Sequence, residues 1–153
     1  MIVFLYGRDG YRLKQNLDRI TTEYRKKNTG MSFSVLDGGA DCQDLLQRLE
    51  DLIKTVSFFD EKKLIVLKNV FLINKGVIEL VKRWGVAGDK ERVLVFIENS
   101  GKDELVKKDR GLFNLLSTKP NIVKSFEPLE GKRLENWAKE EIESFDVKIN
   151  RRP

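Results

Sequence analysis

Five apolar runs alternate with segments of helical periodicity, and this order limits the fold more than any other feature of the sequence. The predicted strands lie at 1–6, 31–38, 62–70, 91–99 and 121–128. The predicted helices lie at 8–28, 40–55, 73–85, 108–118 and 130–145. Such alternation predicts an α/β fold of three layers, in which helices sandwich a parallel five-stranded sheet.

The predicted strands differ in their apolar patterns. The run at 1–6 is continuously apolar, which is typical of a parallel strand buried on both faces, and we expect the strands at 62–70 and 91–99 to be buried as well. The run at 31–38 alternates and places Phe33 and Val35 on one face. The run at 121–128 is shorter, so we expect it nearer an edge of the sheet.

The predicted helices carry apolar residues three and four positions apart, as a face that packs on a sheet requires. In the first helix these residues are Leu13, Leu17, Ile20 and Tyr24. In the second helix they are Leu45, Leu49, Leu52 and Ile53. Asp9 is a predicted N-cap of the first helix, and Lys26 and Lys27 suit the negative end of its dipole.

The pattern changes after Pro128, where a further helix follows the last strand. Its partial apolar stripe consists of Leu134, Trp137, Ile142 and Phe145. We expect residues 1–129 to form one domain and residues 130–153 to begin a second domain that the sequence truncates. The alternative is that this helix folds back onto the sheet.

Composition excludes several classes of function. The sequence contains no histidine, which excludes Ser-His-Asp and Cys-His catalysis and most zinc sites. Cys42 is the one cysteine, so no disulfide forms within the chain, and we interpret this thiol as structural. Neither a membrane span nor a signal peptide is evident, and we expect a cytoplasmic protein. The net charge of +5 is compatible with nucleic acid or an acidic protein as a partner.

The turn after the first strand resembles a phosphate-binding loop in position only. Such a loop needs two glycines separated by four residues, followed by Lys and Ser or Thr. Here only Arg8 and Asp9 separate Gly7 from Gly10, and the next residues are Tyr11 and Arg12. Asp9 would repel a phosphate, and no hydroxyl is placed to hold magnesium.

The third predicted strand also lacks what ATP hydrolysis requires. Acidic residues should follow this strand to hold the metal, but Lys68 and Asn69 stand there. We therefore expect no ATP hydrolysis, no cofactor and no metal site. The adjacent carboxylates Glu140 and Glu141 lie in a charged helix, and we interpret them as solvated.

Two adjacent phenylalanines, Phe58 and Phe59, lie between a predicted helix and the third strand. A large apolar pair at an element boundary can plug the protein's own core or anchor a partner's pocket. The residues alone favour the core for at least one of the two.

Three stretches together resemble the delta subunit family of bacterial DNA polymerase III. They read IVFLYGRDGYRLKQNLDRI, LLQRLEDLIKTVSFFDEKKLIVLKNV and VLVFIENSGKDELVKKDRGLFNLL. In that family the first strand ends in Tyr-Gly-x-Asp/Glu, a Ser-Leu-Phe-like element precedes a strand ending in Lys-Asn, and a Lys/Asp/Arg-rich helix follows the next strand. The resemblance covers roughly residues 1–145. Phe58 departs from the family, which usually has leucine at this place.

The resemblance implies an AAA+-like domain that is not itself an ATPase, followed by a helical lid that begins near Glu130. It implies that the subunit binds the beta sliding clamp and helps to open the ring for loading onto primed DNA in replication. The implied clamp-binding residues are Val56, Ser57, Phe58 and Phe59. Further implied partners are the gamma/tau and delta prime subunits of the bacterial polymerase III holoenzyme, with DNA contacted indirectly or weakly.

Two other interpretations remain open. The first is a DNA-binding domain, because Lys107, Lys108 and Arg110 cluster, as do residues 25–27. Such clusters are more often the cation-rich ends of helices. The same three residues could contact another subunit. The second interpretation is a nucleotide-dependent enzyme with an unusual loop.

Overall fold

A parallel sheet forms the centre of the computed structural model, which describes residues 1–28, 32–40, 43–55 and 62–145. Its strands are β1 (Ile2–Tyr6), β2 (Ser32–Asp37), β3 (Lys63–Lys68), β4 (Arg92–Glu98) and β5 (Ile122–Ser125). Their order across the sheet is β2-β3-β4-β1-β5, and every pair is parallel. The predicted five-stranded parallel sheet is therefore confirmed, as is the position of β5 at an edge.

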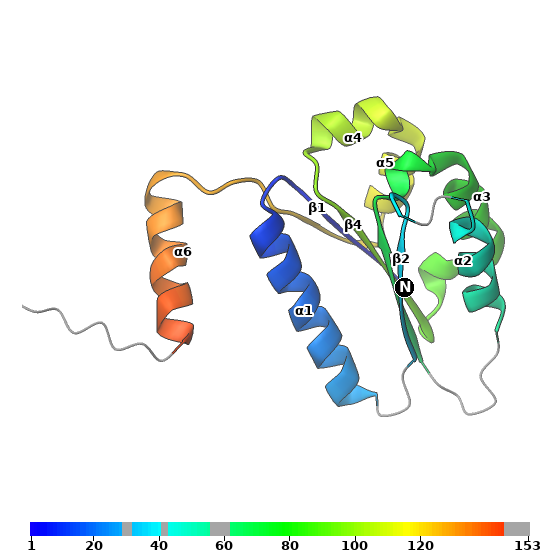
Figure 1. The fold of residues 1–153 in the computed structure, drawn as a ribbon, viewed down its shortest axis with the longest axis horizontal. Helices are drawn as coiled ribbons and strands as arrows, with labels where there is room; N and C mark the ends of the chain where they lie inside the picture. Colours follow the sequence, from blue (N-terminus) through cyan, green and yellow to red (C-terminus); the bar gives the residue numbers. More distant parts are fainter. Residues whose placement is uncertain (29–31, 41–42, 56–61, 146–153) are drawn as a thin grey trace, which may run out of the picture.

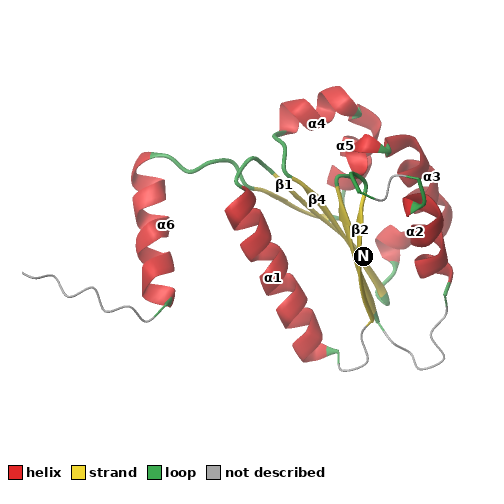
Figure 2. Ribbon diagram, in the orientation of Figure 1, coloured by secondary structure: helices red, strands yellow, loops and turns green. Residues whose placement is uncertain are grey.

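Helices lie on both sides of this sheet, as the alternation predicts (Figures 1 and 2). The helices are α1 (Gly10–Lys27), α2 (Leu45–Lys54), α3 (Asn74–Trp84), α4 (Lys102–Lys108), α5 (Arg110–Ser117) and α6 (Gly131–Ser144). Two short 3-10 helices are η1 (Val70–Leu72) and η2 (Val86–Gly88). Helix α1 covers one face, and α2 to α5 cover the other. None of the helices in the described ranges combines the length and apolarity needed to cross a membrane.

Each face of the sheet has its own apolar core. On the α1 face, Leu13 packs with β1, β3 and β4 side chains such as Val3, Leu64 and Val95. On the other face, α2 buries Leu45, Leu49 and Ile53, while Leu52 is partly buried. The predicted apolar faces of the first two helices are thus confirmed in their main contacts. Burial of these side chains holds the helices to the sheet.

The segment after β4 differs from the prediction. A single helix at 108–118 is expected there, but α4 precedes α5, and the chain turns between them at Asp109. The Asp109 side chain accepts a hydrogen bond from the Leu112 N–H at 2.9 Å and so caps α5. Helix α4 escapes prediction because it is short and buries only Leu105.

Helix α6 lies beside α1 and not on the sheet (Figure 1). The rings of Tyr11 and Trp137 meet edge to face, with centroids 5.7 Å apart. The Glu141 carboxylate accepts hydrogen bonds from the Tyr11 hydroxyl at 2.9 Å and from the Gln15 amide at 2.8 Å. No residue of α6 is buried, so the alternative in which this helix folds back onto the sheet is not supported.

Two charged side chains are buried in the part of the chain that the structure describes, those of Lys63 and Glu98. Glu98 ends β4, and its carboxylate accepts a hydrogen bond from the Phe71 N–H at 3.2 Å. Burial raises the pKa of Glu98 from 4.5 to about 7, although backbone hydrogen bonds from Val70 and Phe71 oppose the shift. The folded state therefore holds a proton that the unfolded chain releases near pH 4.5.

The raised pKa of Glu98 predicts that stability falls as the pH rises. Its contribution to the free energy of unfolding is complete below about pH 4.5 and disappears as the pH passes 7. The loss amounts to about 3 kcal/mol. Glu98→Gln keeps an acceptor for the Phe71 N–H and cannot ionise, so it should remove this loss. Urea unfolding of both proteins between pH 5 and pH 8 measures it, and parallel pH profiles would contradict the assignment.

Candidate protein-interaction site

The turn after β1 is closed by the backbone that follows β5. Gly7 has a φ of 141°, and a Cβ at this position would lie 2.1 Å from the Phe126 carbonyl oxygen. The Gly7 N–H donates to the Glu98 carbonyl oxygen at 3.1 Å, and the Asp9 N–H donates to the Phe126 carbonyl oxygen at 3.0 Å. In a phosphate loop such N–H groups would face the phosphates. Here they are bonded to the protein's own backbone.

The positive end of α1 is also occupied by an acidic side chain. The Asp9 carboxylate accepts a hydrogen bond from the Arg12 N–H at 3.1 Å, which confirms Asp9 as the predicted N-cap. Its second oxygen lies 3.4 Å from the Arg12 guanidinium. A phosphate at this helix terminus would meet a carboxylate at close range. The turn therefore joins β1, β5 and α1, and its Gly7 and Asp9 N–H groups are engaged within the chain.

The carboxyl ends of β2 and β3 carry a hydrogen-bonded pair, Asp37 and Asn69. Asn69 takes a left-handed backbone conformation, with a φ of 55°, and its amide donates to the Asp37 carboxylate at 2.9 Å. This bond and the Gly39 N–H hold the pKa of Asp37 below its usual value. Among the described residues, no three His, Cys, Asp or Glu side chains come close enough together to hold a metal ion.

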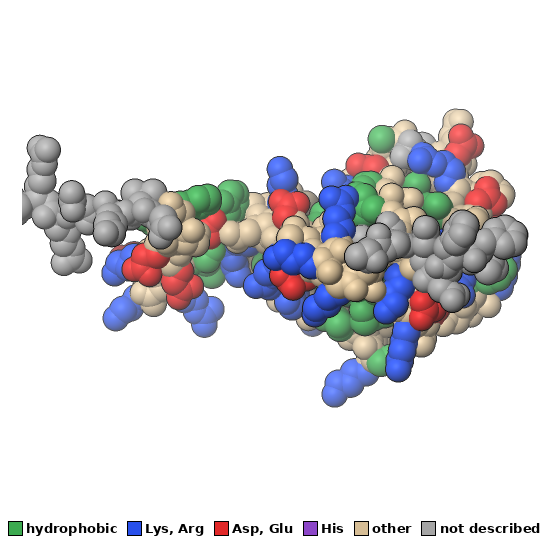
Figure 3. All heavy atoms as spheres, turned by 90° about the horizontal axis from the view of Figure 1, so that it is seen from below, with side chains coloured by type: hydrophobic (Ala, Val, Ile, Leu, Met, Phe, Trp, Pro, Cys, Tyr) green, Lys and Arg blue, Asp and Glu red, His purple; other side chains and the backbone are tan. Residues whose placement is uncertain are grey.

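The predicted clamp-binding residues, Val56, Ser57, Phe58 and Phe59, lie outside the described residues, as does Cys42. The described chain ends at Thr55 after α2 and resumes at Lys62 before β3. Both flanks lie at the amino-end edge of the parallel sheet, opposite the Gly7 turn (Figure 1). In Figure 3, which looks at the molecule from this side, Lys and Arg side chains project in several places with acidic side chains between them.

Two cations fix the end of α2 that leads into this segment. Lys63 Nζ donates to the carbonyl oxygen of Leu52 at 3.0 Å and to that of Thr55. Arg92 Nη1 donates to the carbonyl oxygen of Ile53 at 2.8 Å. The last carbonyls of a helix lack partners within the helix and carry negative partial charge, so cations close to them stabilise the helix end. Sequence reasoning missed both cations, although a lysine opening a buried strand is a usable signal.

The predicted DNA or subunit contacts, Lys107, Lys108 and Arg110, come together where α4 meets α5. All three side chains are exposed. Among the residues with described positions, no ion pair engages any of them. Lys107 and Lys108 occupy the last turn of α4, where the helix dipole favours cations. Their contact with a partner remains a prediction.

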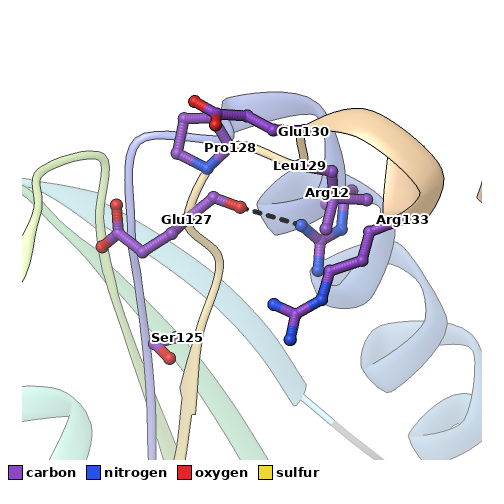
Figure 4. A pocket seen from close by; sticks show the side chains of 7 residues that line it. All are labelled: Arg12, Ser125, Glu127, Pro128, Leu129, Glu130 and Arg133. Atoms are coloured by element: carbon purple, nitrogen blue, oxygen red, sulfur yellow. Dashed lines mark hydrogen bonds between the residues drawn. The ribbon is translucent and has the colours of Figure 1, made fainter.

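A hollow of about 490 Å³ lies where the chain passes from β5 to α6 (Figure 4). Its lining consists of Arg12, Ser125, Glu127, Pro128, Leu129, Glu130 and Arg133. The Arg12 guanidinium donates to the Glu127 carbonyl oxygen at 3.0 Å, while Arg133 extends into the hollow without touching that carbonyl. Two arginines are balanced by two glutamates, so the lining does not favour an anion. The Arg12 bond instead ties the chain to α1 just before α6 begins.

Comparison with solved structures identifies the fold. The ORC2 protein of Aeropyrum pernix, solved as ADPNP–ADP complexes, gives a TM-score of 0.55 at 11% identity, over 93% of this chain and 45% of that chain. A structure described as a DNA replication initiation factor gives a TM-score of 0.46 at 14% identity, over 97% of this chain and 46% of that chain. This chain spans less than half the length of either. The first likeness confirms the AAA+-like fold.

The sequence comparisons identify the family. No curated protein matches this sequence. Residues 4–126, well over half of the chain, match the family described as DNA polymerase III, delta subunit. The resemblance seen in the three stretches is therefore confirmed, and this chain belongs to the DNA polymerase III delta subunit family.

Proposed function

We propose that this chain binds the beta sliding clamp through residues 56–59 and helps to open the ring for loading onto primed DNA. Within the clamp loader its further partners would be the gamma/tau and delta prime subunits, in the bacterial cytoplasm. Family membership supports the role. The observation that carries the site is the anchoring of α2 by Lys63 and Arg92 directly before residues 56–59.

The anchoring matters because a short segment loses more conformational entropy on binding when its ends are free to move. Each side chain or loop residue that becomes ordered on binding reduces the affinity. Hydrogen bonds from Lys63 and Arg92 fix the backbone at residues 52–55 before any partner arrives. Two aromatic anchors could then each contribute about 1.5–3 kcal/mol on full burial. Phe58, in the place of the family's usual leucine, is large and apolar enough for the same pocket.

The proposed mechanism is conformational. A binding domain opens a ring only if it binds the open shape more tightly than the closed one, and the shift cannot exceed that difference. ATP hydrolysis would belong to other subunits. The engaged N–H groups of Gly7 and Asp9, with Lys68 at the end of β3, support a domain that does not hydrolyse ATP.

The division of the chain is part of the same proposal. Residues 1–129 would form the clamp-binding domain, and residues 130–153 would begin the helical lid. Helix α6 supports this division, because it buries no residue and leaves Leu134, Ile142 and Phe145 exposed. An exposed apolar stripe on a helix is typical of an element that packs against further structure.

The aromatic pair is tested by replacing Phe58 and Phe59 with alanine. If both fill a pocket of the clamp, the dissociation constant of the complex should rise about 100-fold or more, because two anchors are lost. Titration calorimetry with the beta clamp measures it, with Leu72→Ala as the control. Leu72 is 60% exposed and lies beyond the opposite end of β3. Absence of binding by the unchanged chain would refute the proposed function.

The anchoring of α2 is tested by Lys63→Met. This change leaves the carbonyls of Leu52 and Thr55 without their cation, which should lower the free energy of unfolding by about 1–3 kcal/mol. The affinity for the clamp should fall as well, because residues 56–59 would then follow a less ordered end of α2. Lys90→Met changes an exposed lysine and should alter neither quantity. Equal urea unfolding curves for Lys63→Met and the unchanged chain would contradict the assigned role.

A further inference from the structure

Two apolar side chains on β2 are left uncovered by the helix that covers the rest of their face. Phe33 and Val35 pair in register with Leu64 and Val66 of β3, so all four lie on the α1 face. Leu64 and Val66 are completely buried, whereas Phe33 is 39% exposed and Val35 is 42% exposed. The side chains buried under α1 come from β1, β3 and β4, and β2, at the edge, contributes none to this cluster.

An arginine from α1 completes this surface, here named the β2 patch and defined as Arg25, Phe33 and Val35. The Arg25 guanidinium carbon lies 5.0 Å from the centre of the Phe33 ring. A cation over an aromatic face is attractive and restricts the motion of both side chains. Aromatic residues and arginine are also the types enriched in protein interfaces. The β2 patch thus has the composition of a contact surface.

The β2 patch lies near Lys62, where the described chain resumes after the segment proposed to bind the clamp. The Ser32 N–H donates to the Lys62 carbonyl oxygen at 3.0 Å, and Lys62 is the first described residue after residues 56–61. Phe33 is the second residue of β2, so it lies close to the amino-end edge of the sheet, where both flanks of the segment lie (Figure 1).

The area that a stable protein interface buries also favours the beta sliding clamp as the partner of the β2 patch. A stable interface buries about 800 Å² on each protein. Two phenylalanines supply at most about 500 Å². The remaining area of roughly 300 Å² must come from Val56, Ser57 and the neighbouring surface, where the β2 patch offers exposed apolar side chains.

We propose that the β2 patch is a second contact with the beta sliding clamp and extends the interface formed by residues 56–59. The proposal rests on the proposed clamp-binding function. A clamp seated on residues 56–59 would cover Phe33 and Val35 at the same time. The patch would then set the angle at which the clamp lies against the sheet, since two separate contacts fix an orientation that one does not.

Clamp titration with variants of the 153-residue chain tests the patch. Phe33→Ala should weaken binding on the order of tenfold, and Arg25→Ala by about threefold, because it removes only the cation that orients the ring. Arg25 is exposed, so this variant keeps the test valid if Phe33→Ala unfolds, which thermal melting would detect. Leu72→Ala is the matched control and should bind within twofold of the unchanged chain.

The outcomes separate the two proposals. If the unchanged chain does not bind the clamp, the proposed function itself fails. If it binds and the Phe58 and Phe59 variant loses binding, while the patch variants bind as the control does, the second contact is refuted and the function stands. Normal clamp binding with weakened binding to another loader subunit would also refute it. Weakened clamp binding by both patch variants, each folded, would establish the contact.

Discussion

The close approach of Gly7 to the backbone of Phe126 is the contact on which the rest of the structure depends. It brings the ends of β1 and β5 together and turns the chain into α1, with no room for a Cβ. The Asp9 N–H donates a hydrogen bond to the Phe126 carbonyl oxygen, and the Gly7 N–H donates one to the Glu98 carbonyl oxygen. The N–H groups of a turn that resembles a phosphate-binding loop in position thereby join the strands of the sheet.

The opposite edge of the sheet, where its strands begin, combines an anchored helix end with partly exposed apolar side chains. Cations from β3 and β4 fix the end of α2, and the exposed side chains of the β2 patch lie nearby. In a parallel sheet all strands start at one edge and end at the other, so the two edges can serve different purposes. The architecture of a nucleotide-binding fold is thus compatible with a domain whose function lies in protein contacts.

The sequence predicts the fold well because hydrophobic periodicity is a local property. The continuous run at β1 and the helical spacing of Leu13 and Leu17 can be read without knowing what they contact. The exposure of Phe33 cannot be predicted in this way, because it depends on how far α1 extends across the sheet. The hydrogen bonds of Lys63 are missed for the same reason, since the carbonyls that accept them belong to the end of α2. The role of Phe58 and Phe59 remains a prediction from the family.

The register of β1 has a consequence for how this chain folds as it is synthesised. Ile2 pairs with Leu94, and Val3 pairs with Ile122. During synthesis β1 therefore has no partner strand until Leu94 and the residues around it have followed. Contacts this distant in sequence form slowly, and an unpaired apolar strand can associate with other chains in the meantime. Sequestration of residues 2–6 by a chaperone would protect the nascent chain during this interval.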